Sequence, residues 1–290
     1  MSDYVLISDS TTDLTTDLIK ECDLEIIPLL YTLKGKDYYD YADEREMKFH
    51  DFYEILRGGD LSTTSLINTG RFIEIFEAHL KQGKDVLYIG FSSGLSGTYN
   101  ASRMAADELS EKYPDRKIYA IDSLAASMGE GLLVYLAAKE KEKGKSIDEV
   151  RDFVLDNRLN LCHWFTVDDL FHLYKGGRVS KTAATVGSML NIKPVLHVDD
   201  EGHLIPISKA RGRKMSVSGL FKNMKKTAVN PENQVVFISH GDCLEEAEIL
   251  KEMVIEKLGV KKVYMNYIGP VIGTHSGPGT IALFYLGEHR

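Results

Sequence analysis

Hydroxyl side chains gather in three short segments where the chain is expected to turn, and hydroxyl groups can bind an anion. The segments are residues 8–13, 62–65 and 92–99. Serine and threonine hydroxyls donate hydrogen bonds, and the free N–H groups at the start of a helix attract negative charge. Helix capping and turn formation are the simpler interpretation of the first two segments. The third lies between a predicted strand and a predicted helix, so we interpret it as a binding loop for a carboxylate or a phosphate.

The loop at residues 92–99 lacks the sequence features of two common alternatives. It has no GxxxxGK[ST] or GxGxxG pattern, so it offers neither the lysine nor the glycine framework of those nucleotide sites. A serine nucleophile prefers the pattern GxSxG, and the segment around Ser96 lacks the first glycine. A hydrolase or phosphotransferase that uses Ser96 or Ser93 with His275 stays open as an alternative.

His275 lies in a segment rich in residues with special backbone conformations. Residues 268–279 contain four glycines and two prolines, which predict a rigid turn around this histidine before an apolar C-terminal helix. A structural role and a ligand contact are both open for His275. Two basic runs, at residues 175–178 and 209–214, form either a solvated surface or docking points for a phosphate or an acidic partner.

Strand-like and helix-like segments alternate in the first half of the chain. Apolar runs predict strands at residues 4–7, 25–33, 86–91 and 117–121, and Pro28 favours an edge or irregular position for the second. Helices are predicted from Asp13 or Thr15 to Cys22, then at residues 48–57, 69–80 with Thr69 as the cap, 98–109, 130–143 and 146–160. This alternation predicts a parallel sheet.

The second half of the chain follows a different order of elements. A strand at residues 162–167 precedes a predicted hairpin of residues 194–198 and 204–208. Residues 235–239, 243–258 and 261–267 then form a strand–helix–strand unit. We therefore predict an α/β protein of two domains, residues 1–160 with a parallel sheet and the hydroxyl-rich loops, and residues 161–290 with a mixed sheet.

The composition is that of a globular protein with an acidic balance. Among 290 residues, 43% are hydrophobic and 27% are charged, and the formal net charge is −8, which disfavours general nucleic-acid binding. No segment approaches the roughly 20 apolar residues that span a bilayer, and no basic stretch opens the chain, so we expect a cytoplasmic location. The three cysteines and the acidic residues show no metal-ligand spacing, and buried thiols are expected.

A set of segments spread along the chain resembles one known family. The segments are residues 9–11, Thr64-Ser65, residues 92–99, 122–131, 176–178, 192–194, 209–213 and 269–279. In this order they resemble the DegV family, which binds fatty acids. The family usually continues Thr-Ser with Gln-Pro, whereas Leu66 and Ile67 follow Ser65 here.

The resemblance implies a two-domain protein that holds a long-chain fatty acid, such as palmitate, between its domains. It implies that the hydroxyls of Thr64 and Ser96 hold the carboxylate, with Ser65, Ser93, Gly94 and His275 nearby. In bacteria such proteins are the binding subunit of fatty acid kinase. They present the acid to a separate ATP-dependent kinase and carry the acyl-phosphate into phospholipid metabolism.

We therefore expect a lipid carrier with no catalytic residue, cofactor or metal of its own. Peripheral or transient contact with a membrane is compatible with this role. From the basic runs we expect Arg178, Arg211 and Arg213 to contact the kinase or the acyl-phosphate, although salt bridges between the domains are an alternative for them.

Overall fold

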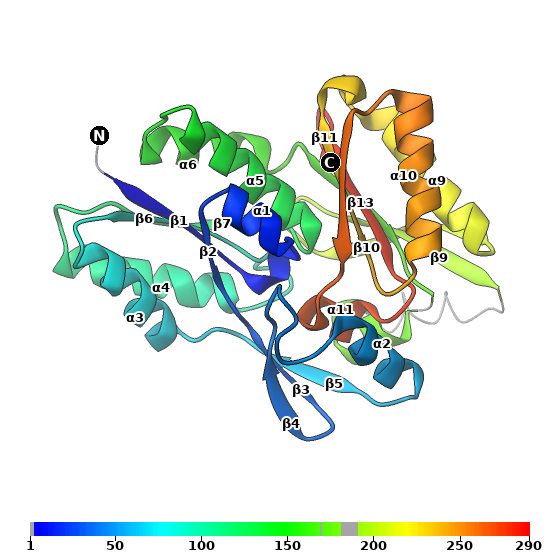
Figure 1. Cartoon of the computed structure of the whole chain (residues 1–290), viewed down its shortest axis with the longest axis horizontal. Helices are drawn as coiled ribbons and strands as arrows, with labels where there is room; N and C mark the ends of the chain where they lie inside the picture. Colours follow the sequence, from blue (N-terminus) through cyan, green and yellow to red (C-terminus); the bar gives the residue numbers. More distant parts are fainter. Residues whose placement is uncertain (1–2, 169, 181–190) are drawn as a thin grey trace.

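Two large β-sheets and one small sheet organise the chain in the computed structural model, which describes residues 3–168, 170–180 and 191–290 (Figure 1). The prediction of an α/β fold with a parallel sheet followed by a mixed sheet is confirmed. In the described part of the chain, no helix is long and apolar enough to cross a membrane.

The first sheet has four parallel strands in the order β2-β1-β6-β7. Its strands are β1 (Tyr4–Asp9), β2 (Leu24–Ile27), β6 (Asp85–Gly90) and β7 (Ile118–Asp122). Helices α3 (Thr69–Leu80) and α4 (Thr98–Lys112) lie on one face, and α5 (Met128–Glu142) and α6 (Ile147–Asn157) lie on the other (Figure 1). All six residues of β6 are buried, as its continuous apolar run predicts.

The observed N-cap residue agrees with the prediction at one helix and differs from it at another. Thr15 caps the short helix α1 (Thr16–Glu21), because its side chain accepts a hydrogen bond from the Leu18 N–H group. The prediction of Thr69 as the cap of α3 is wrong. Asn68 takes that place, and its side chain accepts from the N–H of Arg71.

A small antiparallel sheet departs from the predicted elements. It consists of β3 (Leu30–Leu33), β4 (Lys36–Tyr39) and β5 (Ser62–Ser65), in the order β4-β3-β5. The single strand predicted at residues 25–33 divides at Pro28, because proline cannot donate to a sheet ladder. The hydroxyl run at residues 62–65 is strand β5, so its prediction as a helix start is wrong. Its two β-branched threonines pair with β3, while α2 (Phe49–Arg57) is a helix as predicted.

Among the described residues the second large sheet has six strands in the order β10-β9-β8-β13-β11-β12; β11 and β12 pair in parallel, and the other described pairs are antiparallel. The strands are β8 (Leu161–Thr166), β9 (Ile192–Val198), β10 (Leu204–Arg211), β11 (Val235–His240), β12 (Lys262–Tyr267) and β13 (Ile281–Leu286). Helices α9 (Arg213–Thr227) and α10 (Leu244–Leu258) cover one face of it, and η2 (Pro231–Asn233) precedes β11.

The apolar run after residue 279 is the strand β13 rather than the predicted helix. It lies inside the sheet between β8 and β11, and five of its six residues are buried. A short run that is apolar throughout has no period of its own, so the sequence does not distinguish a buried strand from a buried helix.

Helix α5 forms a shared layer between the two large sheets. It packs on β8, β11 and β13 and also contacts α6 and η1 (Ser10–Thr12). Eleven of its residues are buried, as expected for a helix with neighbours on all sides. Gly129 allows this close approach, because a side chain there would overlap the rings of His163 and Phe284.

One helix from the second half of the chain packs against elements of the first half. All strands up to Asp122 belong to the parallel and small sheets, and all strands from Leu161 belong to the mixed sheet. Helix α11 (Pro270–Ser276) nevertheless contacts α2, β3 and β5, besides α7 (Phe171–Lys175). The division into domains at residue 160 stays a prediction.

Candidate functional site

His275 lies in the last turn of α11, so the prediction of a rigid turn around it is wrong. Pro270 starts this helix, and Gly277 ends it with a φ of 78°. The helix brings His275 against strand β5, where its Nε2 lies 2.9 Å from Oγ1 of Thr64. The small sheet and α11 therefore join two residues that are 211 positions apart in the sequence.

His275 is a neutral imidazole at physiological pH. Burial lowers its pKa to about 4, and the positive charge of Arg178 acts in the same direction. Its Nδ1 is buried against the Gly176 backbone without a hydrogen-bond partner among the described residues. Since a buried N–H without a partner is rarer than an unpaired acceptor, we place the proton on Nε2. Nε2 then donates to Thr64, which leaves the Thr64 hydroxyl proton free for an anion.

Ser96 presents a second hydroxyl from the loop between β6 and α4. Its Oγ lies 2.9 Å from Oγ1 of Thr98 and accepts a hydrogen bond from the Thr98 N–H at 3.2 Å. When the Thr98 hydroxyl donates to Ser96, the Ser96 proton is free for a ligand. The loop precedes the 15-residue helix α4, whose N-terminal dipole favours an anion there.

These groups meet in one polar cavity. Thr64, Ser65, Ser96, Arg178 and His275 line it, together with several apolar residues. Thr64 and Ser96 are half-buried and Ser65 is exposed, so the cavity lies near the surface. His275 pairs with Thr64 and Ser96 pairs with Thr98. The described contacts thus contain no pairing of His275 with Ser96 or Ser93 that would indicate a serine nucleophile.

Arg178 lies inside the site rather than on an open basic surface. Its Nε and Nη2 donate to the Leu95 carbonyl at 3.2 and 3.1 Å, and its Nη1 donates to the carbonyl of Gly176. Burial lowers the pKa of the guanidinium, and no described carboxylate offsets this effect. A half-buried cation without an acidic partner beside a cavity favours an anionic ligand.

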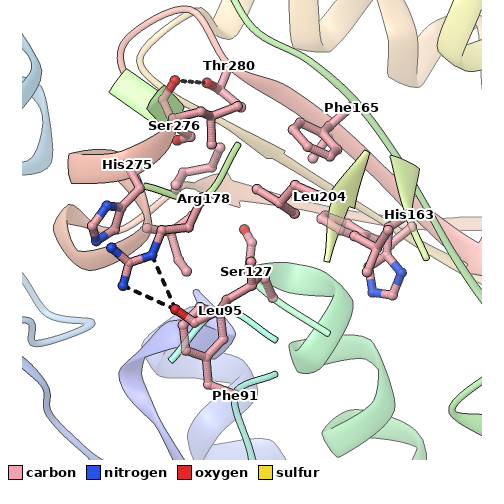
Figure 2. Close-up of a pocket in the computed structure, with 17 residues that line it drawn as sticks. Phe91, Leu95, Ser127, His163, Phe165, Arg178, Leu204, His275, Ser276 and Thr280 are labelled. Carbon is pink, nitrogen blue, oxygen red and sulfur yellow. Dashed lines mark hydrogen bonds between the residues drawn. The ribbon is translucent and has the colours of Figure 1, made fainter. Parts of the chain in front are cut away.

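An apolar cavity adjoins the polar one. Phe91, Arg178, Ile272 and His275 line both cavities. Its wall comes from both halves of the chain, with Leu95 from the first half and Phe165, Leu173, Leu204 and Phe284 from the second. Figure 2 shows Arg178 and His275 together at one side of this cavity and His163 at another. The arrangement suits a ligand with one anionic end and a long apolar chain.

Two predicted site residues line neither cavity. The Ser93 N–H donates to Oδ1 of Asp122 at 3.1 Å. A Cβ at Gly94 would lie 2.8 Å from the carbonyl oxygen of Glu201, so this glycine lets the β9–β10 hairpin pack on the loop. Both residues thus shape the loop that carries Ser96, and their contact with a ligand stays a prediction.

The other two predicted arginines lie apart from the cavities. Arg211 ends β10 with an exposed side chain, for which the described residues offer no ion pair. Arg213 lies near Asp168 and Glu246, at 3.8 and 3.9 Å, and its Nη2 donates to the thiol of Cys243. These partners all lie in the second half of the chain, so the interdomain salt bridges considered from the sequence are not seen for Arg213.

Sequence reasoning missed a set of buried carboxyl groups behind the site. Asp9, Asp13, Asp40 and Glu130 are at most 6% exposed, and burial is the main cause that raises the pKa of each. The Asp13 carboxyl accepts hydrogen bonds from the Ser127 hydroxyl and from the N–H of Gly269, which precedes α11. Asp9 and Asp13 lie in the segment of residues 8–13 that the sequence analysis selected for its hydroxyl groups, but their burial was not predicted.

Among the described residues, His50, Glu54 and Asp242 form a group with the spacing of metal ligands. The guanidinium of Arg57 already pairs with both Glu54 and Asp242. Because this cation neutralises the two carboxylates, we interpret the group as an ion-pair network that links α2 to the loop after β11.

Comparison with known proteins identifies the family. Residues 4–288 match the family model described as "Uncharacterised protein, DegV family". A DegV domain-containing protein of Clostridium perfringens is 49% identical over 100% of this chain and 99% of its own. A Thermus thermophilus structure titled "Fatty Acid Binding of a DegV family Protein" is 29% identical, with a TM-score of 0.89 over 99% of this chain and 100% of its own. A stearic-acid-binding protein of Eubacterium ventriosum is 26% identical, with a TM-score of 0.86 over 98% of each chain. The chain belongs to the DegV family.

Proposed function

We propose that this chain binds one long-chain fatty acid, with the acyl chain in the apolar cavity and the carboxylate in the polar cavity. The observation that carries the proposal is the junction of the two cavities at Arg178 and His275. The fatty acid binding named for the Thermus and Eubacterium relatives supports it. An acyl chain of about 14 methylene groups, at roughly 0.8 kcal/mol each, would contribute on the order of 11 kcal/mol, part of which offsets immobilisation.

The head group needs a few well-placed donors. In the proposal Thr64 and Ser96 donate their hydroxyl protons to the carboxylate, and His275 orients Thr64 through Nε2. Arg178 balances the negative charge. Its place in both cavity walls favours this role over the contact with a partner expected from the sequence. Ser65 lies at the exposed side of the polar cavity.

The second part of the proposal is presentation of the carboxylate to a separate ATP-dependent fatty acid kinase, which the resemblance implies. The chain would then perform no catalytic step, need no cofactor, and carry the acyl-phosphate after phosphorylation. The position of the polar cavity near the surface supports this role, because the head group would lie where a partner can reach it.

Mass spectrometry of an organic extract of the purified protein tests the first part. We expect about one long-chain fatty acid per chain, since the buried apolar surface favours retention during purification. Extracts without fatty acid, together with no binding of added stearate, would contradict the proposal. Turnover of an acyl ester by the empty protein would favour the serine hydrolase alternative.

The exposed Arg211 gives a test of the second part. We expect Arg211→Ala to raise the apparent KM about 2- to 5-fold in a reconstituted fatty acid kinase reaction at low salt, with a smaller effect at high salt. Lys84→Ala is the matched control, because it removes one positive charge next to the start of β6. Equal KM values for the two variants would remove Arg211 from the docking surface.

A further inference from the structure

The wall of the apolar cavity contains a buried imidazole, at the side away from Arg178 and His275, that has no visible partner. His163, on β8, is 1% exposed and lines this cavity. Both of its ring nitrogens are buried without a hydrogen-bond partner among the described residues. Most buried polar atoms in proteins are hydrogen-bonded, so an imidazole with two unpaired nitrogens calls for a ligand group or a water molecule.

Packing fixes this ring in place. Its neighbour across the strand pair, Phe284, meets it edge to face, with ring centroids 5.5 Å apart and an interplanar angle of 83°. On another side Cδ2 and Nε2 of the ring lie close to Gly129, where no larger residue would fit. The carbonyl oxygen of His163 accepts a hydrogen bond from Nδ1 of His197 at 2.7 Å. The imidazole is therefore a preorganised group rather than a mobile one.

The ring is neutral and so carries one donor and one acceptor. Burial lowers the pKa of His163 well below its usual range, and the positive charge of Arg290 acts in the same direction. A neutral imidazole can donate to, or accept from, a hydroxyl group. A purely apolar acyl chain would offer neither nitrogen a hydrogen-bond partner.

We propose that His163 forms a second polar subsite, which binds a hydroxyl group carried by the acyl chain. The preferred ligand class is then a hydroxylated long-chain fatty acid; this inference rests on the proposed binding of fatty acids. Figure 2 shows His163 across the cavity from Arg178 and His275, so the hydroxyl group must be remote from the carboxylate.

The expected discrimination follows from the penalty for burying an unpaired hydroxyl group. Where no polar side chain of the wall reaches it, the hydroxyl group would lose its bonds to water without replacement, which weakens binding by roughly 5- to 150-fold relative to the unsubstituted acid. A hydrogen bond to the imidazole of His163 would replace the lost bonds to water. At the matching position on the chain, the hydroxy acid should bind at least as tightly as stearate.

Competition binding to the full chain, freed of lipid, tests the inference with stearate and a series of hydroxystearates. Each member of the series carries its hydroxyl group at a different carbon. We expect one position to reach the affinity of stearate or exceed it, while the other positions bind at least about 5-fold more weakly. If every hydroxystearate binds more weakly than stearate by a similar factor, the inference is wrong, and this result needs no variant.

Two variants assign the effect to the imidazole. His163→Phe should abolish the positional preference, and His163→Gln, which keeps a donor and an acceptor, should restore part of it. His240→Phe makes the same exchange at a buried histidine outside the cavity lining and should keep the profile of the parent. A preference that survives in His163→Phe would overturn the assignment. Failure of stearate itself to bind would instead overturn the proposed function.

Discussion

Thr64→Val is expected to weaken fatty-acid binding about 10- to 150-fold, and Ser96→Ala should have an effect of similar size. In the proposed site each change removes one hydrogen bond to the carboxylate, and charge-assisted bonds of this kind contribute roughly 1.5–3 kcal/mol. The valine in place of Thr64 keeps the branched shape of the strand residue but cannot accept from Nε2 of His275. Titration with stearate, followed by calorimetry or by displacement of a fluorescent fatty acid, measures the loss.

Thr63→Val is the matched control for this experiment. Thr63 precedes Thr64 on β5, and its side chain is exposed and lines neither cavity, because successive side chains on a strand point to opposite faces. We expect its affinity for stearate to equal that of the parent. If Thr64→Val and Ser96→Ala also bind like the parent, the carboxylate lies elsewhere.

Local patterns were enough to predict most of the elements around the site. The buried strand β6, the loop with Ser96 and the helix α4 follow from an apolar run, a cluster of hydroxyl and glycine residues, and helical spacing. The hydroxyl run at residues 62–65 is a candidate binding segment in the sequence, but the secondary structure predicted for it was wrong. Four hydroxyl residues serve equally well as a cap or an edge strand, and only the pairing with β3 decides between them.

Contacts between distant residues were not predictable from such patterns. The bond between Thr64 and His275 depends on where α11 packs, and α11 itself was read as a turn because of its glycines. Arg178 belongs to a basic run that resembles a solvated surface in the sequence. Its guanidinium reaches the Leu95 carbonyl only because the α7 segment folds over the loop after β6.

The buried carboxyl groups should make the protein less stable as the pH rises, and Asp40→Asn isolates one of them. Burial raises the pKa of Asp40 from 3.8 to about 7. When the pKa of a carboxyl group is higher in the folded protein than in the unfolded chain, its contribution to stability is fully present below the pKa of the unfolded chain. That contribution is lost as the pH rises through the folded pKa. The free energy of unfolding should therefore fall between about pH 4 and pH 7, by about 4 kcal/mol for this group alone.

Buried histidines have the opposite effect on stability, and their pH range overlaps that of Asp40. His275 and His163 have lowered pKa values, so their contribution to stability is lost as the pH falls below about 6.5. The parent alone thus mixes two effects at acidic pH. The difference between Asp40→Asn and the parent removes the histidine contribution, because both proteins contain the same histidines.

Urea unfolding from pH 5 to pH 8 measures that difference. We expect the stability of Asp40→Asn relative to the parent to grow by about 3 kcal/mol over this range, since only the parent must ionise the carboxyl group of Asp40. Asp156→Asn makes the same exchange at an exposed residue of α6 and should keep a constant difference from the parent. Parallel curves for Asp40→Asn and Asp156→Asn would mean that Asp40 ionises in the fold as readily as in the unfolded chain.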